Sequence, residues 1–404
     1  MANTAPVAPM GIRLTWLDGM KGISILWIVF FHFFGTYANG RYPSPLGSHY
    51  FSSFLAQCAP SSGFATVGCI AQGFFVAISS VGFHAVAVFL VLSGFGLTYS
   101  LAKTGAPENG WIGWYRGRLL RLFPMYWLAH LIYLISPFVA RPEPIDYRFF
   151  LSFLGDRIYP IDMIFYYANP AWWYFGLLLE LYLVFPVLFR LLQRLGPTWF
   201  LILCGFITLM SRYLLLVVIP VSGYYVQGAF FGARLWEFAL GMVIGLLYRR
   251  HPAMVEQQLF SGSTLLAGAV LYTIGLYSYE TLLFYTMTDA LIGTGLFVIL
   301  AHLAKWSDRL PRVETVVAYV GAYSYGLYLL HQPYVIYFGD QMRGLSLPVF
   351  VVLACGIITV ITLCTIPLER YVNQLTNHYQ TGKKKAQLAV AGYQPQPEKM
   401  QSKV

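Results

Sequence analysis

One apolar segment carries a lysine and a histidine whose types and spacing suit chemistry on a long substrate. Lys21 and His32 are eleven residues apart. In an α-helix this is about three turns, so both side chains face the same side, roughly 16 Å apart along the axis. A cation at one end and a titratable base further along suit a donor with phosphates at one end and a reactive group at the other, and the pantetheine arm of coenzyme A has about that reach. Alternatively, Lys21 only marks a membrane edge and His32 makes a structural hydrogen bond.

A pair of arginines opens another apolar segment. Arg118 and Arg121 lie three residues apart, in Arg118-Leu-Leu-Arg121-Leu-Phe-Pro124-Met-Tyr126-Trp127. Two guanidinium groups on one helical stripe form a good phosphate clamp. From this motif alone, a topology anchor beside a belt of aromatic residues is an equal alternative.

A third motif combines opposite charges with small residues. Arg234 and Glu237 have the same spacing of three residues and can neutralise each other, so structural pairing is the favoured interpretation. Gly241 and Gly245 follow in the same segment, where they allow a second helix to approach closely.

The composition shows what kind of protein must position these residues. Of 404 residues, 58% are hydrophobic and 10% are charged, against about 25% charged in an ordinary soluble domain. The mean hydropathy is +0.61. These values exclude a soluble enzyme, a disordered chain and a collagen-like rod. The net charge of +10 does not indicate nucleic acid as a partner, because the basic residues lie between apolar runs. We therefore predict an all-α polytopic membrane protein in contact with membrane lipid.

The apolar runs predict a bundle of about ten transmembrane helices, since a span needs about 20 mainly apolar residues. The stretch 50–79 is apolar but broken by Pro60 and Gly63, and we interpret it as re-entrant or interfacial. The predicted spans are 19–36, 80–101, 119–137, 172–193, 198–219, 226–248, 260–278, 283–304, 316–339 and 346–368.

The distribution of Lys and Arg sets the expected orientation. Most of them fall on one set of connections, which the positive-inside rule places in the cytoplasm together with both termini. The long segments 37–79 and 138–171 then lie outside. We expect a transmembrane domain over 1–375 in the cytoplasmic (inner or plasma) membrane, and a polar, disordered cytoplasmic tail over 376–404.

Five cysteines are too few for a disulfide scaffold. Cys58 and Cys69 share one outside segment, where a bridge can form, but free thiols are the favoured alternative. Neither cysteine nor histidine shows the spacing of a metal site, and we expect no metal.

Ionisable residues at membrane depth are expensive and are functional candidates by default. Counting about 1.5 Å per residue from the cytoplasmic ends puts His32 and His331 at a similar depth, with Glu180, Arg234 and Glu237 near the bilayer middle. We expect a polar layer there, in which a histidine oriented by a carboxylate could do acid–base work. The candidates are His32, Glu180, Arg212, Arg234, Glu237, Asp289 and His331.

Six motifs in order resemble those of the integral-membrane acyltransferases known as acyltransferase family three, over about residues 13–370. The family pattern has an arginine where this sequence has Lys21, which meets a phosphate as a point charge without bidentate geometry. The motifs are Asp18-Gly19-Met20-Lys21 followed by ten residues and then His32, Phe89-Leu-Val-Leu-Ser93-Gly94-Phe95, Arg118 to Trp127, Trp172-Trp173-Tyr174 to Glu180, Arg234 to Gly241, and Tyr323-Ser324-Tyr325-Gly326 to His331-Gln-Pro333.

The resemblance implies a membrane O-acyltransferase. It implies transfer of an acyl group, usually acetyl, from cytosolic acyl-CoA to a hydroxyl of a cell-envelope polysaccharide, lipid-linked sugar or related acceptor. His32 would be the central catalytic residue, acting as general base or as a covalent acyl carrier, two mechanisms that the sequence leaves open.

The resemblance assigns roles to the other motif residues as well. Glu180 and His331 would support His32 in catalysis, and the outside segments 37–79 and 138–171 could form the acceptor cleft. The residues expected to hold the donor phosphates are Lys21, Arg118 and Arg121. The residues expected in structural or supporting roles are Asp18, Ser93, Arg234 and Glu237.

Three other interpretations compete with this one. A transporter or flippase would use the polar layer for its substrate, but the sequence shows no repeat symmetry. A different acyltransferase fold could also bury a histidine. A catalytically inactive relative is the third alternative, for which Lys21 is the only sign. Binding and turnover of acyl-CoA separate these interpretations.

Overall fold

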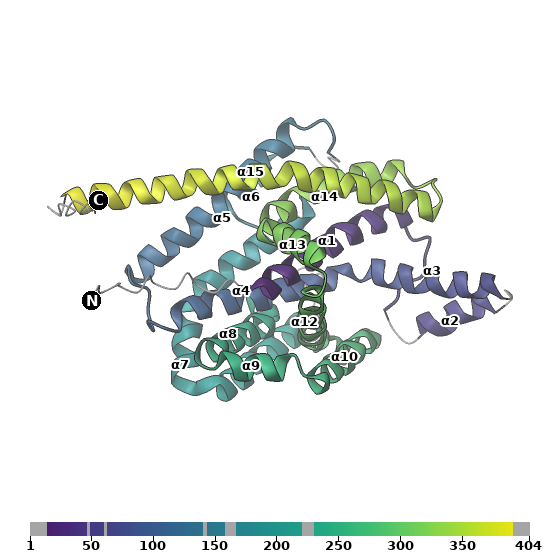
Figure 1. Cartoon of the computed structure of the whole chain (residues 1–404), viewed down its shortest axis with the longest axis horizontal. Coiled ribbons are helices and arrows are strands. Elements are labelled where there is room, and N and C mark those ends of the chain that lie inside the picture. Colours follow the sequence, from purple (N-terminus) through teal and green to yellow (C-terminus); the bar gives the residue numbers. More distant parts are fainter. Residues whose placement is uncertain are drawn as a thin grey trace, which may run out of the picture.

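The computed structural model describes residues 14–46, 49–59, 63–139, 144–157, 167–219 and 230–390. Within these ranges the secondary structure is entirely helical, which confirms the predicted all-α class (Figure 1). The elements are α1 (Thr15–Ala38), α2 (His49–Cys58), α3 (Phe64–Ser80), η1 (Gly82–His84), α4 (Ala85–Leu101), α5 (Gly110–Ile135), α6 (Tyr147–Leu154), η2 (Pro170–Trp172), α7 (Trp173–Tyr213), η3 (Leu214–Val218), η5 (Phe231–Arg234), α8 (Leu235–Arg250), α9 (Pro252–Leu259), α10 (Gly262–Tyr277), η6 (Ser278–Glu280), α11 (Leu282–Tyr285), α12 (Thr288–Ser307), α13 (Pro311–Ala322), α14 (Ser324–Gln341) and α15 (Leu347–Val390).

Among the described residues, six helical stretches are long and apolar enough to cross a membrane, judged by length and composition. A seventh is added if α9 and the stretch Gly262–Glu280, bent by 60°, form one span. The predicted number of about ten spans and the cytoplasmic position of both termini therefore stay predictions. The six stretches are Thr15–Ala38, Phe64–Leu101, Pro170–Val218, Phe231–Arg250, Thr288–Ser307 and Leu347–Gln380.

The predicted span 316–339 is not one helix, because the chain breaks between α13 and α14 at Tyr323. The N–H groups in the first turn of a helix have no partner within that helix. At α14 one of them, the Gly326 N–H, donates to Glu369 Oε2 of α15 over 2.7 Å. A carboxylate in this place also suits the positive end of the helix dipole. The break thus depends on a contact with a distant helix, which hydropathy alone cannot reveal.

The predicted spans 172–193 and 198–219 are joined end to end in α7. The helix is interrupted at Gly196, whose φ of 75° is non-helical, and Pro197 follows it. Glycine adopts this left-handed backbone at little cost, whereas other residues rarely do. The two predicted segments are therefore separate helical pieces, divided close to the expected place.

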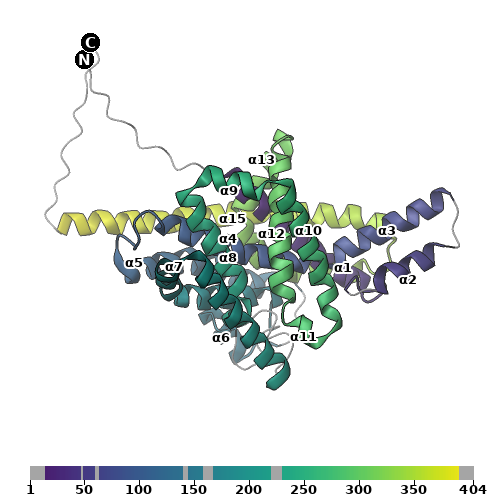
Figure 2. The ribbon, with the colours of Figure 1, turned by 90° about the horizontal axis from the view of Figure 1, so that it is seen from below.

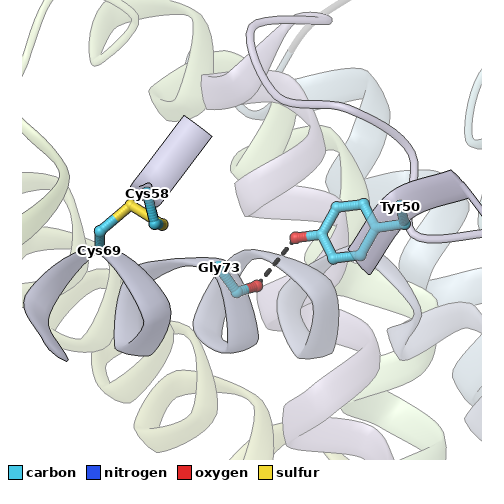
Figure 3. Close-up of a disulfide and its surroundings, with 4 residues drawn as sticks. All are labelled: Tyr50, Cys58, Cys69 and Gly73. Carbon is cyan, nitrogen blue, oxygen red and sulfur yellow. Dashed lines mark hydrogen bonds between the residues drawn. A yellow bond between two sulfur atoms is a disulfide. The ribbon is translucent and has the colours of Figure 1, made fainter. Parts of the chain in front are cut away.

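The stretch 50–79 forms two helices, α2 and α3, which project from the rest of the bundle (Figures 1 and 2). They fold back on each other and bring Cys58 and Cys69 into a disulfide, with 5.7 Å between the Cα atoms (Figure 3). The favoured expectation of free thiols was wrong, because sequence spacing does not show that the two helices pair. The Tyr50 hydroxyl donates to the Gly73 carbonyl over 2.8 Å and joins the same two helices.

Helix α15 continues through Val390, well beyond the predicted end at residue 368. The helix thus extends into the segment 376–404 as far as residue 390. The predicted division into a transmembrane domain and a disordered tail stays a prediction. Residues 391–404 lie outside the described residues. In Figure 1 this long helix passes over α5 and α14, which it also contacts.

Small residues let several helices meet backbone to backbone. A Cβ added at Gly241 of α8 would overlap the Val91 carbonyl oxygen of α4, so this glycine allows the close approach that the sequence predicts. Helix α1 meets α13 in the same manner. A Cβ at Gly22 would overlap the Val317 carbonyl oxygen, and one at Gly321 would overlap the Asp18 carbonyl oxygen.

We expect Gly22→Ala to destabilise the protein, because the added methyl group would push α1 away from α13. Overpacking of this kind costs about 1–3 kcal/mol. Gly35→Ala is the matched control on the same helix, since nothing lies within 4 Å of a Cβ added there. The thermal unfolding midpoint of the purified protein should fall for the first variant and hold or rise for the second. Equal midpoints for the two variants would contradict the close packing of α1.

Candidate active site

A cavity of about 870 Å³ opens between α1, α4, α5, α7, α14 and α15. This volume lies within the range of small-molecule sites, about 300–1,000 Å³. Three cations line it, Lys21 from α1 and Arg118 and Arg121 from α5. The structure thus brings together the three residues that the sequence singled out for phosphates, from two helices far apart in the chain.

The cations of the cavity differ in their partners. Lys21 Nζ lies 3.2 Å from Asp18 Oδ1, one turn earlier on α1. The Arg118 guanidinium lies over the Trp114 ring, 5.5 Å from its centre. Within the described ranges neither Arg118 nor Arg121 has a carboxylate within ion-pair distance. The cavity therefore keeps positive charge that is available to an anionic ligand.

Two buried arginines elsewhere in the bundle, Arg212 and Arg234, are neutralised by carboxylates instead. Arg234 pairs with Glu237 over 3.0 Å, as their spacing predicts, and with Asp289 over 2.8 Å. Arg212 also pairs with Asp289. Since a buried charge is tolerated when it is paired, these side chains have the contacts of a structural network that joins α7, α8 and α12.

The inner wall of the cavity is formed by hydroxyl groups and aromatic rings. Ser93 Oγ lies 3.4 Å from the Tyr174 hydroxyl. The Tyr174 and Tyr328 ring centres are 5.3 Å apart. Tyr328 in turn lies 5.8 Å from the ring of His331, which is not part of the cavity lining. The tyrosine therefore stands between the cavity and the deeper histidines.

His32 and His331 form a close pair behind this wall. Their ring centres are 5.3 Å apart, with His32 on α1 and His331 on α14. The Gln332 side chain approaches His32 Nδ1 at 3.3 Å. His331 Nδ1 contacts the carbonyl oxygens of Leu327 and Tyr328 at 3.0 and 2.9 Å, which fixes the orientation of its ring.

A proline in α14 explains how His331 is held. Pro333 has no N–H, so the Leu329 carbonyl four residues earlier loses its helical partner. Two side chains from the α7 end replace it, as Asn169 Nδ2 and Trp172 Nε1 each donate to the Leu329 oxygen over 2.9 Å. The turn that carries His331 is thus tied to a segment more than 150 residues away.

Arg157 stabilises the segment that carries Asn169. It is fully buried and donates to Ser152 Oγ over 2.8 Å and to the carbonyl oxygens of Tyr167 and Asn169 over 3.1 and 3.3 Å. Sequence reasoning missed Asn169, Arg157 and Gln332 as positioning residues. A proline inside a helix was the available signal, because it requires donors for the carbonyl that it leaves free.

The predicted polar layer is divided in the structure. Glu180 Oε2 accepts from the Phe231 N–H at the start of η5, over 2.8 Å. In the described part of the chain no hydrogen bond or ion pair joins Glu180, Arg234 or Glu237 to His32. Counting along helices gave similar depths, but it does not say which way each helix faces across the bundle.

A family model described as an acyltransferase domain, that of acyltransferase family 3, matches residues 14–368. The match contains the three cavity cations and both histidines of the pair. No curated protein and no solved structure matches the chain.

We expect Trp172→Phe to lower stability by removing one donor to the Leu329 carbonyl while keeping an aromatic ring. A hydrogen bond of this kind contributes about 0.5–1.5 kcal/mol. In a Pro333→Ala background the new N–H of residue 333 can serve that carbonyl, so the same Trp172 change should cost less. Thermal unfolding midpoints of the four proteins measure the difference. An equal cost in both backgrounds would show that the carbonyl does not depend on these donors.

Proposed function

The chain belongs to acyltransferase family 3, and on this premise we propose that it is a membrane O-acyltransferase that uses acyl-CoA. The acyl group is acetyl, and the acceptor is a hydroxyl of a cell-surface polysaccharide, lipid-linked sugar or related envelope molecule. The enzyme works in the cytoplasmic (inner or plasma) membrane, with the donor bound from the cytoplasm.

The single observation that carries the proposal is a cationic cavity whose inner wall includes Tyr328, the ring of which lies 5.8 Å from His331 of the histidine pair. Lys21, Arg118 and Arg121 line one cavity, and two of them lack an ion-pair partner among the described residues. Guanidinium groups match phosphate oxygens in geometry as well as in charge. A donor with a diphosphate is the kind of ligand that such a wall attracts.

The length of α1 fits the length of that donor. Lys21 and His32 are separated by about three helical turns, roughly 16 Å. Tyr328 is the side chain that a thioester extending inward meets before it reaches the histidines. The phosphates would stay at the wide end of the cavity while the acyl group lies against Tyr328.

His32 acts as general base in this proposal. Its Nε2 takes the proton of the acceptor hydroxyl while the oxygen attacks the thioester carbonyl, and the bond to sulfur breaks to release CoA. The nitrogen is free for this when Nδ1 carries the ring proton. The structure has the Gln332 amide nitrogen facing Nδ1 over 3.3 Å. A half-turn of the carboxamide brings its oxygen to the same place, where it accepts the Nδ1 proton and selects that tautomer. A covalent acyl group on the same nitrogen, passed on to the acceptor, is the alternative.

The hydrogen bond of Glu180 supports a different role for this residue. Its carboxylate holds the first turn of η5 rather than a histidine. We propose that His331 and Gln332 are the groups that orient His32, and that Glu180 positions the segment leading into α8.

We expect His32→Ala to lower the release of free CoA thiol from acetyl-CoA by about 100-fold or more, the usual contribution of a general base. His251→Ala, at the exposed end of α8, is the control and should keep the wild-type rate. The assay uses the purified full-length protein with and without a glycan acceptor. Wild-type turnover in the His32 variant would remove this residue from the chemistry.

We expect Arg118→Gln and Arg121→Gln each to raise KM for acetyl-CoA by about ten-fold or more, because each removes a charge-assisted hydrogen bond to phosphate. Arg116→Gln is the matched control, since Arg116 is exposed on the same helix and does not line the cavity. Steady-state kinetics over a range of acetyl-CoA concentrations separates the variants. Equal KM values for all three would place the phosphates elsewhere.

A further inference from the structure

The far wall of the cavity is a polar stripe on α15. Its residues follow the spacing of one helical face and all line the cavity together with the cations of α1 and α5. The residues of the stripe are Glu369, Asn373, Thr376, Asn377 and Gln380. The whole stripe follows residue 368, where the family match ends. It is therefore a feature of this chain that the family match does not account for.

The length of α15 indicates that this stripe lies at the edge of the hydrocarbon core of the membrane. The stretch Leu347–Gln380 has 34 residues, which at about 1.5 Å per residue is roughly 50 Å. The hydrocarbon core of a bilayer is only about 30 Å thick. Part of the stretch must extend beyond the core, and its polar end, from Asn373 to Gln380, is the part suited to water and to a polar ligand.

Two carboxamides of the stripe, those of Asn373 and Gln380, are available to hydrogen-bond a ligand. Glu369 accepts from the Gly326 N–H, and the Thr376 hydroxyl donates to the Val372 carbonyl within α15. Asn373 and Gln380 make no side-chain hydrogen bond within the described part of the chain. Each presents one acceptor oxygen and an NH₂ with two donors toward the cavity.

The two walls of the cavity thus offer different chemistry. The wall of α1 and α5 carries positive charge and suits phosphates, whereas the α15 stripe has no cation and includes the Glu369 carboxylate, which repels them. Carboxamides pair with the donor and acceptor atoms on the edge of an adenine base. We propose that Asn373 and Gln380 recognise the adenosine end of the acyl-CoA donor, an inference that rests on the proposed function.

The test compares two ligands that share the pantetheine arm and differ in the nucleotide. Binding of CoA and of 4′-phosphopantetheine to the full-length protein in detergent is measured by titration calorimetry. For the double variant Asn373→Ala with Gln380→Ala, we expect CoA to bind about ten-fold more weakly, the scale of a lost amide–adenine pair. Binding of 4′-phosphopantetheine should be unchanged.

Gln374→Ala is the matched control, because Gln374 is an exposed amide on the same helix that does not line the cavity. It should bind both ligands as the wild type does. If CoA binds the wild type and the double variant equally, or if both ligands weaken together, the adenosine assignment is wrong and the proposed function stands. If the wild type binds neither ligand, the proposed acyl-CoA dependence fails, and the assignment fails with it.

Discussion

The contact of α1 with the backbones around it is the constraint on which the other features of the site depend. Gly22 and Gly321 let α1 and α13 meet with no side chain between them. Because α1 carries both Lys21 and His32, this contact fixes the positions of a cation and of a histidine within the bundle at the same time. A larger separation of the helices would move Lys21 out of the cavity wall and His32 away from His331.

The break between α13 and α14 follows from the same arrangement. α13 must stay close to α1, while α14 must turn to bring His331 against His32. Glu369 stabilises the new helix start, and Asn169 and Trp172 stabilise the turn before Pro333. A backbone group left unpaired in the membrane interior costs several kcal/mol, so each irregularity of α14 requires a donor or acceptor from elsewhere in the chain. The side chains that supply them therefore determine where the histidine lies.

Local periodicity explains what could be predicted from the sequence. The pairs Lys21 and His32, Arg118 and Arg121, and Arg234 and Glu237 are each separated by close to a whole number of helical turns. This spacing brings two side chains to one face of a helix whatever that helix packs against. The break at Tyr323, the Cys58–Cys69 bridge and the position of Glu180 are set by contacts between distant segments. The depth of a residue along a helix can be counted from the sequence. Which neighbouring helix its side chain faces cannot. That is why residues expected in one polar layer lie in separate networks.

The pairing of charges distinguishes arginines that hold the fold from arginines that can hold a ligand. Arg212 and Arg234 lie between α7, α8 and α12, and both form ion pairs with Asp289. Their charge is therefore neutralised within the protein. Arg118 and Arg121 have no such partner in the described part of the chain, although their helix packs against α14 and α15. Two like charges three residues apart repel each other unless an anion lies between them. An anionic donor relieves that repulsion when it binds, which gives the cavity an affinity for phosphates that the neutralised network does not have.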